Sequence, residues 1–144
     1  IILRNPIERT WSHAKMILGK WKTRDISSIK DEEFFDFFKR ELREERANYN
    51  KILRNWEEVF SKSKVLILFY EDLETKPHDF FKDVCSFLEI STDGLEERLK
   101  QKINVGDKTK IPIKYERWLQ NVYKPMILEL IHNYPEFEHP KKWL

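Results

Sequence analysis

The fold is decided by residues 1–12, which read IILRNPIERTWS. The first three are apolar and mostly β-branched, as at the end of a buried strand. Helix-start signals follow at once: Asn5 can cap a helix, Pro6 suits its first position, and Glu8 is placed for a capping box. A strand that leads directly into a helix predicts an α/β protein.

Apolar residues in the rest of the chain predict one more strand and several helices. Val65–Phe69 is an unbroken apolar run, typical of a strand buried on both faces of a parallel sheet. The apolar positions of the predicted helices are Ile7, Trp11, Ala14 and Leu18; Phe34, Phe35, Phe38 and Leu42; Tyr49, Ile52, Leu53, Trp56 and Phe60; Phe80, Phe81, Val84, Phe87 and Leu88; and Tyr115, Trp118, Leu119 and Val122. A short helix is predicted from Leu95 to Gln101.

Several local signals refine these elements. Asp31 is expected to cap the second helix, and Thr75 with Pro77 to start the fourth. Pro125 should kink or break the last helix. We expect a loop at Gly19–Ile29 and an extended tail after residue 133.

Two strands cannot complete an α/β sheet, because a strand buried on both faces needs neighbours on both sides. We therefore expect residues 1–144 to be a single helix-rich domain that is truncated at its N-terminus, so that the missing strands precede Ile1. An exposed sheet edge would then favour a homo-oligomer.

Composition excludes several classes of protein. The 27 basic and 25 acidic residues nearly balance, which gives no support for binding nucleic acid or an anionic membrane. No apolar run approaches the roughly 20 residues of a membrane span. The one cysteine, Cys85, allows no intrachain disulfide and fits a buried thiol in a reducing compartment, so we expect a cytoplasmic protein. No metal-ligand constellation is visible.

Arg4 is the first candidate for binding chemistry. Ligands of open α/β sheets bind at the carboxyl ends of strands, and helix N-termini attract anions. The planar guanidinium of Arg4 matches phosphate, and Ser12 lies about 10 Å along the helix that follows. These residues predict an anion site, although an isolated Arg and Ser are more often plain surface residues.

Residues 4–12, RNPIERTWS, resemble the sulfotransferase signature R-N-P-x-x-R-x-x-S. The resemblance implies that Arg4 and Ser12 bind the 3′-phosphate of 3′-phosphoadenosine 5′-phosphosulfate (PAPS). An arginine at the position of Arg9 resembles the signature of the bacterial and heparan-type branches more than that of the cytosolic small-molecule branch. Residues 65–73, VLILFYEDL, resemble the family's L-x-L-F-Y-E-D segment, which implies that Tyr70 lies by the adenine; the alternative is a strand-end tyrosine that only packs.

Weaker similarities extend the resemblance along nearly the whole chain. They include Tyr49 to Phe60 and the C-terminal Tyr123-Lys124-Pro125 with Trp143. A basic loop resembles the family's loop over the 3′-phosphate in either of two registers, and neither fixes which lysine binds. The candidate residues are Lys102, Gly106, Lys108 and Lys110.

The resemblance implies a P-loop-NTPase-like three-layer fold with a parallel sheet. It also implies in-line transfer of a sulfuryl group from PAPS to an acceptor hydroxyl or amine, with 3′-phosphoadenosine 5′-phosphate (PAP) as product and no metal. The family's 5′-phosphosulfate loop and general base normally precede the position of Ile1. Because the three glycines are never adjacent and the four histidines do not match the family's base, no catalytic residue is assigned.

Two readings of function remain open. In the first, the chain supplies the 3′-phosphate and adenine half of a sulfotransferase donor site. In the second, it is a non-catalytic fragment that binds an adenine nucleotide or another protein. The loop Gly19–Ile29, with Lys20, Trp21, Lys22 and Arg24, would border the acceptor cleft for a small molecule or saccharide; the alternative is a plain solvated loop.

Overall fold

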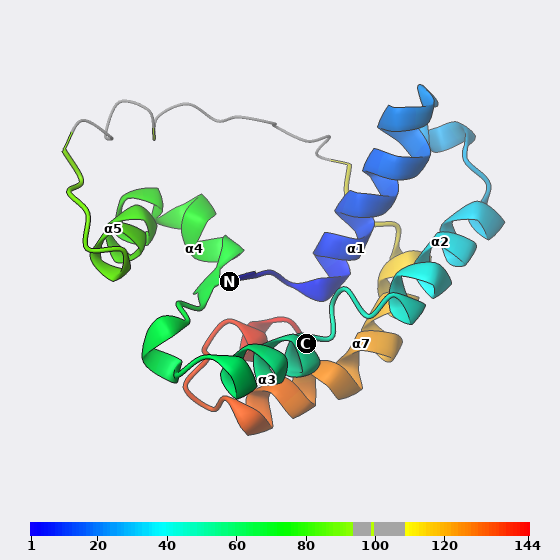
Figure 1. Ribbon diagram of the computed structural model, residues 1–144. Coiled ribbons are helices and arrows are strands. Elements are labelled where there is room, and N and C mark those ends of the chain that lie inside the picture. The colour runs from blue at the N-terminus through cyan, green and yellow to red at the C-terminus, as the bar shows by residue number, and fades with distance from the viewer. Residues whose placement is uncertain (94–98, 100–108) are drawn as a thin grey trace. The chain divides into compact units, whose positions relative to one another are not determined.

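The computed structural model describes residues 1–93, 99 and 109–144 (Figure 1). The chain divides into two compact units. Unit 1 consists of Ile1–Arg4 with Leu53–Val105, and unit 2 of Asn5–Ile52 with Gly106–Leu144. The boundary therefore falls inside the signature, between Arg4 and Asn5.

Unit 1 contains two short parallel strands, β1 (Ile2–Leu3) and β2 (Leu68–Phe69). Ile2 pairs with Leu68 and Leu3 with Phe69, and the Leu68 amide donates to the carbonyl of Ile1 at 2.9 Å. Strand β2 is shorter than the predicted strand Val65–Phe69. The first four residues of that predicted run are only half-buried. The physical reason is that β2 has one partner strand among the described residues, so only the pairing end is regular.

The helices of unit 1 follow β2 without a loop. Helix α4 (Tyr70–Thr75) starts at the residue after the strand, and α5 (Pro77–Phe87) has its proline in the first turn, as predicted. The Thr75 hydroxyl donates to the carbonyl of Glu71 at 2.8 Å, inside α4. Phe80 and Cys85 are the buried residues of α5, and Cys85 is a free thiol. Helix α3 (Tyr49–Val59) crosses the boundary between the units.

Unit 2 is built on three helices: α1 (Pro6–Ala14), α2 (Asp31–Arg43) and α7 (Ile113–Asn133). Helix α1 continues as a π-helical turn, Lys15–Gly19. The core of the unit is aromatic, because the rings of Trp11, Phe34 and Tyr115 lie 4.9 to 5.8 Å apart. The predicted apolar face of α1 is confirmed, since its four members are all buried.

One expectation about unit 2 was wrong, and a second is refined by the structure. Helix α2 is capped by Lys30, and Asp31 is its first residue. The Asp31 carboxylate instead accepts from the Tyr115 hydroxyl at 2.6 Å and pairs with Lys114, so it is not available as a cap. The predicted loop Gly19–Ile29 contains two 3₁₀ turns, Lys20–Lys22 and Ile26–Ser28.

The C-terminal region also differs from expectation. Helix α7 runs through Pro125 without a break, with buried Tyr123 and Ile127 on either side of the proline. The tail is folded rather than extended. It contains a 3₁₀ turn at Pro140–Lys142, and Trp143 is buried with its ring centroid 6.1 Å from that of Tyr49. Burying this large ring fixes the tail against unit 2.

The described residues form a helix-rich protein with a small two-stranded parallel sheet, which is compatible with the α/β class. The helix predicted from Leu95 to Gln101 lies outside the described residues, apart from Leu99. Across residues 1–93, 99 and 109–144, none of the helices is both long and apolar enough to cross a membrane.

Candidate anion-binding site

Arg4 and Tyr70 lie side by side at one edge of the strand pair in unit 1. Because Leu3 pairs with Phe69 in parallel, the next residue of each chain segment emerges at the same carboxyl edge. The guanidinium carbon of Arg4 lies 4.3 Å from the centroid of the Tyr70 ring, and both residues are half-buried. This distance is well within cation–π range. The sequence singled out both residues separately but did not predict their contact.

The start of α1 is built as the sequence predicted. The Asn5 side-chain oxygen accepts from the Ile7 amide at 2.9 Å, which caps the helix, and Pro6 occupies its first turn. The Arg9 amide donates to the Asn5 carbonyl at 2.9 Å and so begins the helical hydrogen bonding. A capped N-terminus of a nine-residue helix carries positive potential.

Ser12 lies on α1 with its side chain exposed, directly after the buried Thr10 and Trp11. Its hydroxyl is accessible to a ligand. Ser12 belongs to unit 2 and Arg4 to unit 1, so each is positioned by its own unit. What links the two residues is their spacing in the signature.

The described end of the basic loop is attached to α1 within unit 2. The Trp11 indole donates to the Thr109 carbonyl at 3.0 Å, and the Lys15 ammonium donates to the same oxygen at 3.2 Å. Lys110, a predicted site residue, follows Thr109 and is exposed. Lys15 follows Ser12 by three positions, so it lies on the same side of the helix. Lys15 was not among the residues predicted for the site.

The other predicted loop residues cannot be placed. Lys102, Gly106 and Lys108 lie outside the described residues. Their assignment to the site stays a prediction.

A family model of the sulfotransferase domain matches residues 1–111 of the chain. The chain belongs to the sulfotransferase family. No curated protein and no solved structure matches it. The matched region contains Arg4, Ser12, Tyr70 and Lys110, whereas the whole of α7 follows it. The similarity to the bacterial and heparan-type branches stays a prediction.

The second arginine of the sulfotransferase signature makes a buried ion group. Glu41 on α2 is 2% exposed, and its carboxylate lies 3.5 Å from the Arg9 guanidinium and 3.0 Å from Nδ1 of His13. The His13 ring also packs edge-on against Phe37 at 5.2 Å. Arg9 and His13 are one turn apart on α1, so Glu41 fixes that helix against α2. Glu41 was not predicted from the sequence, because it looks like one more charge in a helix that carries many acidic and basic residues.

A second buried polar contact ties α1 to α7 in the sulfotransferase domain. The Thr10 and Tyr123 hydroxyls lie 2.8 Å apart, and the two residues are 0% and 1% exposed. Burial raises the pKa of Tyr123, so the phenol is neutral at physiological pH. Helix α1, which carries Ser12, is therefore held by polar contacts on two sides.

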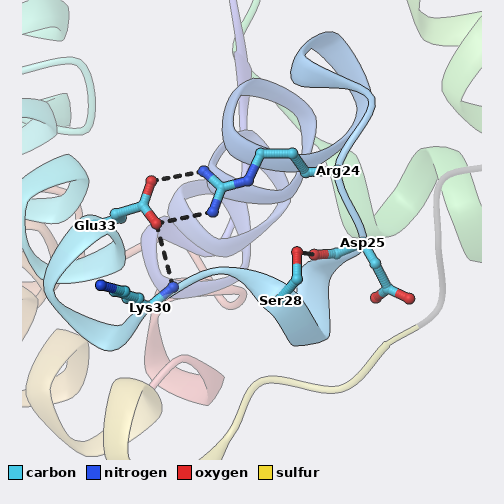
Figure 2. Close-up of polar contacts among 5 residues, drawn as sticks. All are labelled: Arg24, Asp25, Ser28, Lys30 and Glu33. Atoms are coloured by element: carbon cyan, nitrogen blue, oxygen red, sulfur yellow. Dashed lines mark hydrogen bonds and ion pairs between the residues drawn. The ribbon is translucent and has the colours of Figure 1, made fainter.

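The segment after α1, proposed from the sequence to border the acceptor, has a well-defined structure (Figure 2). Arg24 donates two hydrogen bonds to Glu33, at 2.7 and 2.9 Å, and the Ser28 hydroxyl donates to the Asp25 carbonyl at 2.7 Å. This network holds a turn whose Trp21 is 69% exposed. The turn therefore presents the Trp21 indole to solvent.

The part of the chain that the structure describes contains no group of three or more histidine, cysteine, aspartate or glutamate residues that could hold a metal ion.

Proposed function

We propose that this chain supplies the 3′-phosphate and adenine side of the donor site in a PAPS-dependent sulfotransferase. The reaction would be transfer of a sulfuryl group to a hydroxyl or amine of a small molecule or saccharide, without a metal, in the cytoplasm. The proposal is carried by one observation, that the Arg4 guanidinium lies at the carboxyl edge of a parallel strand pair.

The chemistry of the candidate residues suits a phosphate dianion. Arg4 offers a planar set of N–H donors, and Ser12 offers an exposed hydroxyl on α1. Lys110 contributes a cation from a segment attached to the same helix, and we assign Lys102, Gly106 and Lys108 to the same loop. Tyr70, in contact with Arg4, belongs to the same site.

The proposal concerns donor binding and not the transfer step. The 144 residues contain no glycine-rich phosphate loop and no histidine that matches the family's general base. We further propose that β1 and β2 belong to a three-layer, P-loop-NTPase-like sheet, because strands that pair in parallel with Arg4 at their carboxyl edge are what such a sheet requires.

Titration calorimetry with PAP and with adenosine 5′-monophosphate, which lacks the 3′-phosphate, tests the assignment. Arg4→Ala removes hydrogen bonds to a charged group worth about 1.5–3 kcal/mol each. We therefore expect PAP affinity to fall roughly 10- to 100-fold, while affinity for the monophosphate hardly changes. Equal losses for both nucleotides would contradict the assignment of Arg4.

Ser12→Ala should produce a smaller loss with the same selectivity, because a neutral hydroxyl is a weaker phosphate ligand than a guanidinium. Matched controls are Arg117→Ala and Ser86→Ala, which alter exposed residues on α7 and α5. Neither control should change the affinity for PAP. A wild-type chain that does not bind PAP would overturn the proposed function itself.

A further inference from the structure

Tyr70 lies in regular secondary structure, whereas Arg4 lies on a connection between elements. Tyr70 is the first residue of α4 and directly follows the strand residue Phe69, so its backbone belongs to regular structure on both sides. The register of the strand pair is held by the Leu68 amide, which donates to the Ile1 carbonyl at 2.9 Å. Arg4 lies on the connection between β1 and α1. The Tyr70 ring is therefore presented by regular structure, and the Arg4 guanidinium packs over it.

The contact brings the guanidinium carbon of Arg4 over the Tyr70 ring, 4.3 Å from the ring centroid. A guanidinium stacked on a ring keeps its N–H donors in the plane of the group, pointing outward along its edges. Those edges are the part that binds phosphate in a bidentate manner. A cation–π contact at 4.3 Å therefore restricts the rotamers of the long Arg4 side chain.

We propose that Tyr70 is a positioning residue, which acts on the nucleotide by holding the Arg4 guanidinium ready for the 3′-phosphate. The proposal rests on the proposed function. It replaces the role that the resemblance implied for Tyr70, a direct contact with adenine, by a role that passes through Arg4. The part of the tyrosine that matters is then the face of its ring, and the hydroxyl is not required.

The test is a double-mutant cycle measured by calorimetry with PAP and adenosine 5′-monophosphate. Tyr70→Leu removes the ring, and we expect PAP affinity to fall by roughly 5- to 30-fold, the range that corresponds to a cation–π contact. Affinity for the monophosphate should stay unchanged. Tyr70→Phe keeps the ring face, and should retain PAP affinity within about twofold.

Arg4→Ala provides the background that separates the two roles of Tyr70. If Tyr70 acts through Arg4, Tyr70→Leu should cause no further loss of PAP affinity in the Arg4→Ala chain. If Tyr70 contacts adenine directly, Tyr70→Leu should weaken both nucleotides equally and should do so again in the Arg4→Ala background. That second pattern would overturn the inference and leave the proposed function intact.

A measurement without nucleotide guards against a general loss of structure. The ring current of Tyr70 should displace the NMR signals of the Arg4 side-chain protons upfield in the wild-type chain. The displacement should persist in Tyr70→Phe and disappear in Tyr70→Leu, while the signals of the buried Phe80 stay unchanged. Arg4 signals that are the same in all three chains would contradict the positioning role.

Discussion

The carboxylate of Glu41 on α2 lies 3.0 Å from Nδ1 of His13 on α1. The Glu41 side chain is 1% exposed and that of His13 is 18% exposed. The same carboxylate lies 3.5 Å from Arg9, the second arginine of the signature. One buried acid therefore holds two positions of the helix that carries Ser12.

Glu41→Ala should destabilise the chain by about 2–3 kcal/mol. The reason is that Arg9 and His13 lose the buried carboxylate that both of them contact between α1 and α2. Chemical denaturation followed by circular dichroism measures the loss. Glu32→Gln, an exposed change on the same helix, is the control and should stay within about 0.5 kcal/mol of wild type. A loss of similar size in both variants would contradict a special role for Glu41.

The Arg24–Glu33 pair should give the chain an acid-sensitive contribution to stability. Hydrogen bonds from Arg24, and then from the Lys30 amide, lower the pKa of Glu33 from 4.5 to about 2. A lowered pKa in the folded state stabilises the fold above the unfolded value, and this contribution is lost as pH falls from about 4.5 towards 2. The denaturation midpoint of Glu33→Gln should therefore lie below that of wild type at pH 6 and approach it at pH 3. A gap of the same size at both values of pH would contradict this.

The Thr10–Tyr123 contact should contribute measurably to unit 2. Tyr123→Phe leaves a buried hydroxyl on Thr10 without this partner, which should cost about 1–2 kcal/mol. Thr10→Val removes the other hydroxyl. In a double-mutant cycle the two losses should not add, since both variants remove the same bond. Strictly additive losses would show that the hydroxyls do not stabilise one another.

Gly19 packs closely against the Ile26 side chain at the end of the π-helical turn. A Cβ atom at this position would lie 2.5 Å from Cδ1 of Ile26, so one of the two must shift. Gly19→Ala should cost about 1–2 kcal/mol as an overpacked site. Ile26→Val removes the clashing methyl group, so the double variant should be more stable than the sum of the single losses allows. Purely additive losses would place the cause in the backbone instead.

The local elements could be predicted from the sequence because their signals are local. Asn5, Pro6 and Pro77 sit at helix starts, and the apolar spacing of α1 matches its buried face. Arg4 was identified because it ends a predicted strand, and Tyr70 because residues 65–73 resemble a family segment. These predictions required no knowledge of which segments meet.

The remaining features depend on partners that are distant in sequence. Asp31 looks like a cap until Tyr115, 84 positions away, takes its carboxylate. Glu41 looks like a solvated charge until α1 covers it. Pro125 does not break α7, because tertiary packing of its buried neighbours outweighs one missing backbone donor.

The parallel pairing of Ile2 with Leu68 has a consequence for folding itself. These residues are 66 positions apart (68 − 2), so joining them closes a long loop and costs chain entropy. Arg4 and Tyr70 meet only after that closure, and the unfolded chain has no equivalent of their contact. Any ligand held by this pair would bind the folded state alone and would raise the melting temperature in proportion to the logarithm of its concentration.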